Sequence, residues 1–156
     1  MGIKLLLDTS FLLPFFGLDL GDINDIVEKL YYKLSNLYFA EISIYEAKFK
    51  LISLYRKKRI PIDLIENFWE NLRILYDDDR IIFIPYDKEV DANLNHLEKT
   101  LEERLGIVDE LIIASAMLVG NLLTLDEDIL RMRSVMAEKF GLQIFGLTDI
   151  SELVRM

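Results

Sequence analysis

The chain has 156 residues, of which 52% are hydrophobic, no cysteine and a formal net charge of −9. This composition predicts one domain spanning residues 1–156, and it excludes an intrinsically disordered protein, a disulfide framework and a thiolate metal site. The acidic balance also disfavours a general nucleic-acid binder, unless the acids hold cations that reverse the local potential.

Hydropathy excludes a membrane-spanning helix. No apolar run reaches the ~20 residues that a bilayer requires. The longest candidate, residues 111–125, is broken by Ser115, Gly120 and Asn121. The N-terminus has no basic stretch before its apolar run and no small-residue cleavage site after it, so we expect no signal peptide. A cytoplasmic protein without a membrane partner is the simplest interpretation.

Strand and helix patterns alternate along the chain. Apolar runs predict strands at residues 3–8, 37–42, 80–85, 122–125 and 143–145. Helical spacing predicts a short turn at residues 11–16, then helices at 23–35, 44–58, 61–75, 90–105, 108–119 and 127–140, and a short closing helix. This alternation predicts an α/β fold with a central, mostly parallel sheet of about five strands covered on both faces.

Two of these helices have the most specific patterns. The helix at residues 44–58 has an apolar stripe at helical spacing, and Ser43 with Glu46 matches a capping box at its start. The helix at residues 108–119 is nearly all apolar, so we expect it to be buried on most sides.

Acidic residues follow or open several of these apolar segments. They are Asp8, Glu46, Asp109 and Asp126. In an open α/β sheet, sites form outside the carboxyl ends of the strands, where helices begin. We therefore expect the four carboxylates to line one pocket at that edge, where they would suit a hard divalent cation.

Each acid taken alone also has a structural explanation. Asp is a preferred N-cap, and acids in a first helical turn complement the helix dipole. The joint pattern argues for a site, because two carboxylates about 5 Å apart repel by roughly 3 kcal/mol at an effective dielectric of 20. A bound cation or raised pKa values would relieve that repulsion. Glu110, beside Asp109, is expected to face solvent.

Neighbouring residues extend the acidic group. Asp128 is the expected outer support for Asp126, and the hydroxyls of Thr9, Ser10 and Thr124 stand next to the acids. Hydrogen bonds from such hydroxyls to ligating carboxylates are common, although ordinary turn and cap chemistry explains them equally well.

Other reaction classes fit less well. His96, the single histidine, lies opposite the apolar stripe of its helix and is expected to be exposed, which disfavours acyl transfer by a Ser-His-Asp triad. No glycine-rich phosphate loop follows the first strand. A nucleophilic Asp8 of a phosphatase would be expected to have a second acid two residues later, where Ser10 stands.

Basic and aromatic residues suggest partners. The cluster Arg56, Lys57, Lys58 and Arg59 suits a solvated helix C-terminus, and contact with a phosphate backbone is the alternative. Arg131, Arg133 and Lys139 lie along a late helix. The aromatic candidates for a self-association surface are Tyr31, Tyr32, Phe68 and Trp69.

The ordered set of motifs resembles a PIN domain. The residues that carry the resemblance are 7–11, 43–46, Asp109 with the following helix, and 123–128, so it covers most of the chain. It is nearest to the small stand-alone PIN proteins that act as VapC-like toxins. The resemblance implies a three-layer α/β/α fold whose acidic pocket binds Mg²⁺ or Mn²⁺ and cleaves RNA, leaving a 5′-phosphate and a 3′-hydroxyl.

By this resemblance the metal-site and catalytic acids are Asp8, Glu46, Asp109 and Asp126, with Asp128 as an auxiliary acid and Ser10 and Thr124 as supporting hydroxyls. It also implies an antitoxin protein as a possible partner and a homodimer. The leading hypothesis is therefore a metal-dependent endoribonuclease, possibly a toxin. The alternatives are an RNA-processing nuclease without a toxin role and a non-catalytic PIN-like module that binds RNA or protein.

Overall fold

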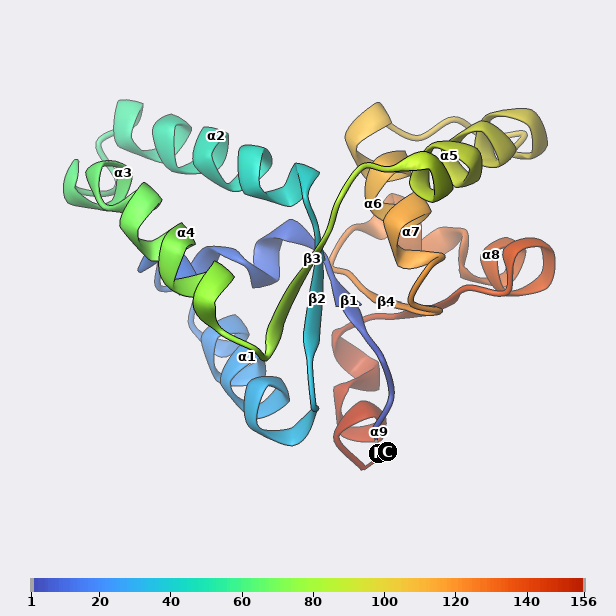
Figure 1. Cartoon of the computed structure of the whole chain (residues 1–156), viewed down its shortest axis with the longest axis horizontal. Helices are drawn as coiled ribbons and strands as arrows, with labels where there is room; N and C mark the ends of the chain where they lie inside the picture. The colour runs from blue at the N-terminus through green and yellow to red at the C-terminus, as the bar shows by residue number, and fades with distance from the viewer. Residues whose placement is uncertain (1, 156) are drawn as a thin grey trace.

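One parallel sheet organises the structure, a computed structural model that describes residues 2–155 (Figure 1). Its strands are β1 (Leu6–Leu7), β2 (Leu37–Ala40), β3 (Ile81–Ile84), β4 (Asn121–Leu123) and β5 (Gln143–Phe145). Their order across the sheet is β3-β2-β1-β4-β5, and every pair is parallel. The predicted mostly parallel sheet is thus confirmed, with β1 at its centre.

Helices cover both faces of this sheet. They are α1 (Asp22–Lys33), α2 (Ile42–Arg56), α3 (Asp63–Glu66), α4 (Phe68–Asp77), α5 (Lys88–Thr100), α6 (Ile107–Ala116), α7 (Glu127–Arg131), α8 (Arg133–Phe140) and α9 (Ile150–Arg155), with 3₁₀ turns η1 (Thr9–Phe11), η2 (Leu13–Phe16) and η3 (Leu147–Asp149). In Figure 1 helices α1 to α4 lie on one side of the sheet and α5 to α8 on the other. The three-layer α/β/α fold is confirmed.

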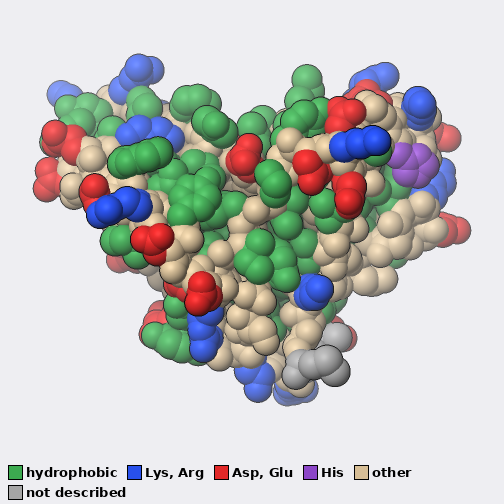
Figure 2. All heavy atoms as spheres, in the orientation of Figure 1, with side chains coloured by type: hydrophobic (Ala, Val, Ile, Leu, Met, Phe, Trp, Pro, Cys, Tyr) green, Lys and Arg blue, Asp and Glu red, His purple; other side chains and the backbone are tan. Residues whose placement is uncertain are grey.

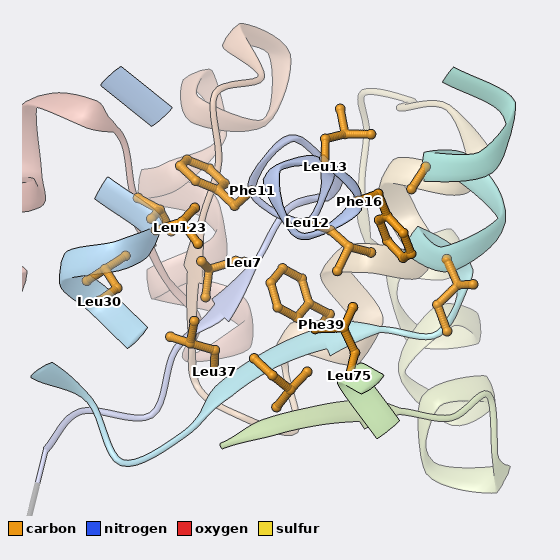
Figure 3. Packing of buried hydrophobic residues seen from close by; sticks show 14 of the residues in the cluster. Leu7, Phe11, Leu12, Leu13, Phe16, Leu30, Leu37, Phe39, Leu75 and Leu123 are labelled. Carbon is orange, nitrogen blue, oxygen red and sulfur yellow. The ribbon is translucent and has the colours of Figure 1, made fainter. Parts of the chain in front are cut away.

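The core is divided by the sheet because neighbouring side chains of a strand point to opposite faces. Leu5 and Leu7 pack on the side of α1, α2 and α4, where Phe39 and Phe11 also lie (Figure 3). Leu6 points to the other side, into the core formed by α5, α6 and α8. Strands this apolar on both faces read as continuous hydrophobic runs, which is why the sequence revealed them.

Three helix boundaries differ from those expected. The segment at residues 61–75 is two helices separated at Asn67, and the segment at 127–140 is two helices separated at Met132. Both residues have φ near −90° and ψ near 0°, a bend that a hydrophobic stripe does not reveal. The helix expected at 90–105 ends at Thr100, because Leu101 is extended and the chain must turn before α6.

No helix of the described part of the chain, residues 2–155, is long and apolar enough to cross a bilayer.

The C-terminus of α2 is a Schellman-type turn with an unusual residue. The N–H of Arg59 donates to the carbonyl of Leu54 at 2.9 Å, and the N–H of Lys58 donates to that of Tyr55 at 2.9 Å. This closure requires a left-handed residue, and Lys58 occupies it with φ of 58°. A side chain is disfavoured there, and glycine is the usual occupant.

Replacing Lys58 by glycine should therefore stabilise the protein. We expect Lys58→Gly to raise the free energy of unfolding by about 0.5 kcal/mol, because relief of the left-handed strain exceeds the added chain entropy. Lys57→Gly is the matched control: it removes the same charge, but Lys57 has φ of −87° and gains nothing from glycine. Urea unfolding measures both, and a loss of stability in Lys58→Gly would contradict the expectation.

Candidate functional site

The carboxylate of Asp8 is the centre of the polar group at the carboxyl edge of the sheet. Asp8 directly follows β1 and is only 8% exposed. Its Oδ1 accepts a hydrogen bond from the N–H of Thr9 at 2.6 Å, and its Oδ2 accepts one from the hydroxyl of Thr124 at 2.7 Å. The Asp8 N–H donates to the carbonyl of Leu123 at 3.0 Å, so β1 and β4 are joined directly beside the site.

Burial is the main influence on the ionisation of Asp8. Desolvation raises its pKa, and the two hydrogen bonds, from Thr124 and Thr9, oppose that rise. The charge of Glu46 raises the pKa of Asp8 further, whereas the positive charge of Lys50 lowers it. Both residues belong to α2, so this helix supplies an acid and a base to the surroundings of Asp8.

A hydroxyl pair fixes α2 against the end of β1. The hydroxyl of Thr9 donates to that of Ser43 at 2.8 Å, and both side chains are buried. The capping box predicted for Ser43 and Glu46 is therefore wrong. The helix begins earlier, at Ile42, which places Ser43 inside the first turn and turns its hydroxyl toward Thr9. Glu46 is half-buried one turn further along α2.

Asp109 is the acid whose ionisation is most strongly affected by the other carboxylates. It lies in the first turn of α6, half-buried. Burial raises the pKa of Asp109 to about 6, and the negative charges of Asp126, Asp8, Glu46 and Asp128 contribute in that order. The charges of the other three predicted site acids therefore all act on Asp109.

Asp126 serves as a helix cap within the same group. Its Oδ1 accepts hydrogen bonds from the N–H groups of Asp128 at 2.8 Å and Ile129 at 3.1 Å, at the start of α7. Its own N–H donates to the hydroxyl of Thr124 at 3.0 Å. Thr124 thus links Asp126 to Asp8, and the cap and the site are compatible functions of one side chain.

The remaining predicted residues lie at the margin. Asp128 is exposed and forms an ion pair with Arg131. Ser10 is half-buried in η1, immediately after Thr9. The role of Ser43 in holding α2 was missed by sequence reasoning, which assigned its hydroxyl to a cap. The signal available in the sequence was that Ser43, Glu46 and Lys50 follow one another at spacings of three and four residues, which places them on one face of a helix.

Glu110 corrects another expectation. It was predicted to face solvent, but it is only 4% exposed. Burial and a hydrogen bond to Glu98 raise the pKa of Glu110 to about 7, and Glu98 lies on α5. The side chain therefore faces the packed α5–α6 contact, while Asp109 beside it faces the acidic group. His96 is exposed, as expected, and its ring meets that of Phe140 edge-on.

The donor set suits a hard divalent cation in its chemistry. It consists of carboxylate oxygens and hydroxyls, and the repulsion that raises the pKa of Asp109 is the kind that a cation relieves. Within residues 2–155, however, no three acidic or histidine side chains are close enough to ligate one ion as they stand. Binding would require a change of rotamer or bridging water in this acidic group.

The chain is similar to one protein family and to several solved structures. A family model described as "PIN domain" matches residues 5–135. No curated protein sequence matches the chain. Three solved structures have the same fold. VapBC2 from Rickettsia felis, bound to a DNA fragment from their promoter, gives a TM-score of 0.62 at 16% identity, covering 91% of this chain and 97% of that chain.

The second is FitAB bound to the IR36 DNA fragment, with a TM-score of 0.58, 19% identity and coverage of 91% of this chain and 94% of that chain. The third is VapBC-5 from Mycobacterium tuberculosis, a member of the VapBC family of toxin-antitoxin systems. It has a TM-score of 0.56, 16% identity and coverage of 92% of this chain and 99% of that chain.

The raised pKa of Asp109 predicts a pH-dependent loss of stability. Its folded pKa of about 6 lies above the ordinary value of 3.8, so the folded state holds the proton more tightly. This contribution is fully present below pH 4 and is lost as the pH rises through 6. Asp109→Asn should therefore be more stable than wild type at pH 7, by about 1 kcal/mol after allowance for solvent screening, with little difference at pH 4.

Urea unfolding at the two pH values provides the measurement. Asp22→Asn is the matched control, because Asp22 also lies in the first turn of a helix but outside the acidic group, so it should not gain stability at pH 7. Equal stability of Asp109→Asn and wild type at pH 7 would show that the carboxylates do not repel one another.

Proposed function

This chain belongs to the PIN domain family, and we propose that it is a metal-dependent endoribonuclease that hydrolyses RNA phosphodiester bonds at its acidic pocket. One observation carries the proposal: the pKa of Asp109 is raised first by burial and then by the charges of Asp126, Asp8 and Glu46. The proposed pocket combines acids from the end of β1, from α2 and α6, and from the residue before α7. An arrangement that costs stability in the free protein is typical of a functional site.

We assign the metal to these four acids. Asp8 and Asp109 would hold Mg²⁺ or Mn²⁺, and Glu46 and Asp126 would complete the pocket, either as ligands or through water. When bound, the metal supplies positive charge that polarises a phosphate oxygen and makes a water molecule more acidic for in-line attack.

The protein's own contribution is to fix these acids in place. Thr9 and Thr124 hold one carboxylate oxygen of Asp8 each, which leaves the side chain little freedom to rotate. The Thr9–Ser43 hydrogen bond sets the position of α2, and with it the position of Glu46. Ser10 and Asp128, at the margin, would act on substrate or water rather than on the metal directly.

The alternative to a nuclease is a non-catalytic PIN-like module that binds RNA or protein. The observation in its favour is that no three acids among residues 2–155 already meet around one point. The presence of all four carboxylates, at a cost in electrostatic repulsion, favours the nuclease. An RNA cleavage assay separates the two.

We further propose that the protein is the toxin of a cytoplasmic toxin-antitoxin pair. Support comes from the similar solved structures, which include VapBC2 and a member of the VapBC family of toxin-antitoxin systems. The surface also offers room for a protein partner. A groove of about 530 Å³ lies between α2 and α4, with Tyr45, Trp69 and Tyr76 exposed along it. Figure 2 shows hydrophobic side chains gathered on this face.

The expected self-association surface needs one correction. Phe68 is 6% exposed and stacks on Phe16 in the core, so it is no surface residue. Tyr31 is half-buried and donates a hydrogen bond to Asp78. Of the predicted aromatics, only Tyr32 and Trp69 are strongly exposed, and the homodimer remains a proposal that rests on them.

The nuclease proposal predicts metal-dependent RNA cleavage. Purified protein incubated with end-labelled single-stranded RNA should cut it with Mn²⁺ and leave it intact with chelator. Asp8→Asn and Asp109→Asn should each lower kcat by at least about 100-fold, because either change removes a charge from the metal site. Asp128→Asn is the matched control, and the loss should be smaller because Asp128 is exposed.

Products with 5′-phosphate ends would agree with the mechanism. If wild-type protein leaves RNA intact in Mn²⁺ but binds it, the non-catalytic module is the correct interpretation. Cleavage that Asp8→Asn leaves unchanged would instead point to a contaminating nuclease.

The toxin proposal predicts a growth defect that depends on the same acid. Induced expression in a bacterial host should arrest growth, and Asp8→Asn at equal protein level should not. Light scattering on the inactive variant tests the dimer, since a dimer has twice the mass of the 18.3 kDa chain. Normal growth with active, well-expressed protein would support an RNA-processing nuclease without a toxin role.

A further inference from the structure

One face of α2 connects the acidic pocket to a row of basic and hydroxyl side chains. Ser43, Glu46, Lys50, Ser53 and Lys57 follow one another at spacings of three or four residues, so they lie on the same face of the helix. We call this set of five residues the α2 row. Ser43 is buried and Glu46 is half-buried, whereas Lys50, Ser53 and Lys57 are exposed.

Hydrogen bonding fixes the direction of the α2 row. Because Ser43 is bonded to Thr9 at 2.8 Å, the row starts against η1, next to the residue that follows Asp8. Lys50, two turns further along, is exposed on the same face of α2, one turn beyond Glu46. The row therefore leads away from the acidic pocket toward the C-terminus of α2, at the outer end of the helix (Figure 1).

Ordinary helix chemistry does not account for Lys50. A basic residue near a helix C-terminus is favoured by the dipole, which explains Arg56 but not Lys50 in the middle of α2. A Glu–Lys pair at i, i+4 would be a second explanation. Among the described residues 2–155, no ion pair joins Lys50 to Glu46; the ion pairs are Arg73–Glu70, Arg104–Glu98, Arg131–Asp128 and Arg133–Asp149.

The charge around the row is opposite to that of the whole chain. Residues 42–59 contain six basic residues and one acidic residue, whereas the chain has a net charge of −9. The net charge of the chain repels a polyanion, whereas the charge of this segment attracts one. The other α2 lysine, Lys48, is on a different face, where it donates to the carbonyl of Ile65 and lies over the ring of Phe68.

We propose that the α2 row is the track on which single-stranded RNA lies as it enters the acidic pocket. In this arrangement Lys50 contacts the phosphate beside the cleaved linkage, and Lys57 contacts one further out. This inference rests on the proposed nuclease function, and it adds the path of the RNA and Lys50 as the residue that positions it.

Helix geometry sets the expected distances along this track. From Glu46, Lys50 is displaced by about 6 Å and Lys57 by about 16 Å along the axis at 1.5 Å per residue. Lys50 therefore reaches a phosphate roughly one or two linkages from the pocket, and Lys57 reaches one several linkages away. Ser53, between them, can donate a hydrogen bond to the same backbone.

The first test removes one charge from the row. Lys50→Met should raise the KM for single-stranded RNA about 10-fold with a much smaller change in kcat, and Lys50→Arg should restore it. The slope of log affinity against log salt should fall by about 0.7 for the lost phosphate contact. Lys29→Met is the matched control: Lys29 is also an exposed helical lysine, but it lies on α1, away from the pocket.

A second test identifies the phosphate. A series of RNAs, each with a single uncharged methylphosphonate linkage near the cleavage point, should contain one that weakens binding to wild type but not to Lys50→Met. The effects of the two changes at that linkage should not add, because both remove the same contact. Additive effects at every linkage would place the RNA elsewhere.

Failure of the inference and failure of the nuclease proposal give different results. Wild-type cleavage with equal KM for Lys50→Met and Lys29→Met would overturn the track and leave the nuclease standing. If wild type does not cleave, fluorescence anisotropy still measures RNA affinity and its salt slope, and a selective loss in Lys50→Met would keep the track as a binding surface. Equal affinities would remove it.

Discussion

The candidate site depends on holding one buried carboxylate, that of Asp8, in a fixed position. Asp8 is almost fully removed from water, and burial opposes its charge. The hydroxyl of Thr124 and the N–H of Thr9 replace part of the lost hydration, one on each oxygen. These two donors come from adjacent strands of the sheet: Thr9 continues the central strand β1, and Thr124 continues its neighbour β4. The parallel pairing of β1 with β4 is therefore a condition for the site as well as for the core.

Two of the acids around Asp8 have hydrogen-bond or ion-pair partners of their own. Asp126 has one oxygen committed to the start of α7, and Asp128 has Arg131 beside it. The pKa of Asp109 is raised to about 6, first by burial and then by the charges of Asp126, Asp8, Glu46 and Asp128. Part of that rise is repulsion between carboxylates, the kind of repulsion that an opposite charge relieves.

Asp109 and Glu110 are neighbours in α6, but their side chains have different surroundings. Asp109 faces the acids of the edge, whereas Glu110 is buried against α5 and hydrogen-bonded to Glu98. A similar separation exists on α2. Lys48 is held by Ile65 and Phe68, but Lys50 is free of ion pairs within the described residues and faces the pocket side. Charge alone does not distinguish these residues; the face of the helix does.

The sequence by itself determined the layered α/β fold and its five strands, and it proposed four acids as a site. The strands are apolar on both faces, and the acids follow a strand or lie in the first turns of a helix, so both patterns are local and readable. Tertiary structure decided what local patterns leave open. The bends at Asn67 and Met132 and the end of α5 at Thr100 appear only in the backbone angles of the folded chain, because the apolar stripe continues across them. The hydroxyl of Ser43 finds Thr9 rather than its own helix end because residues 34 positions apart meet only in the folded chain.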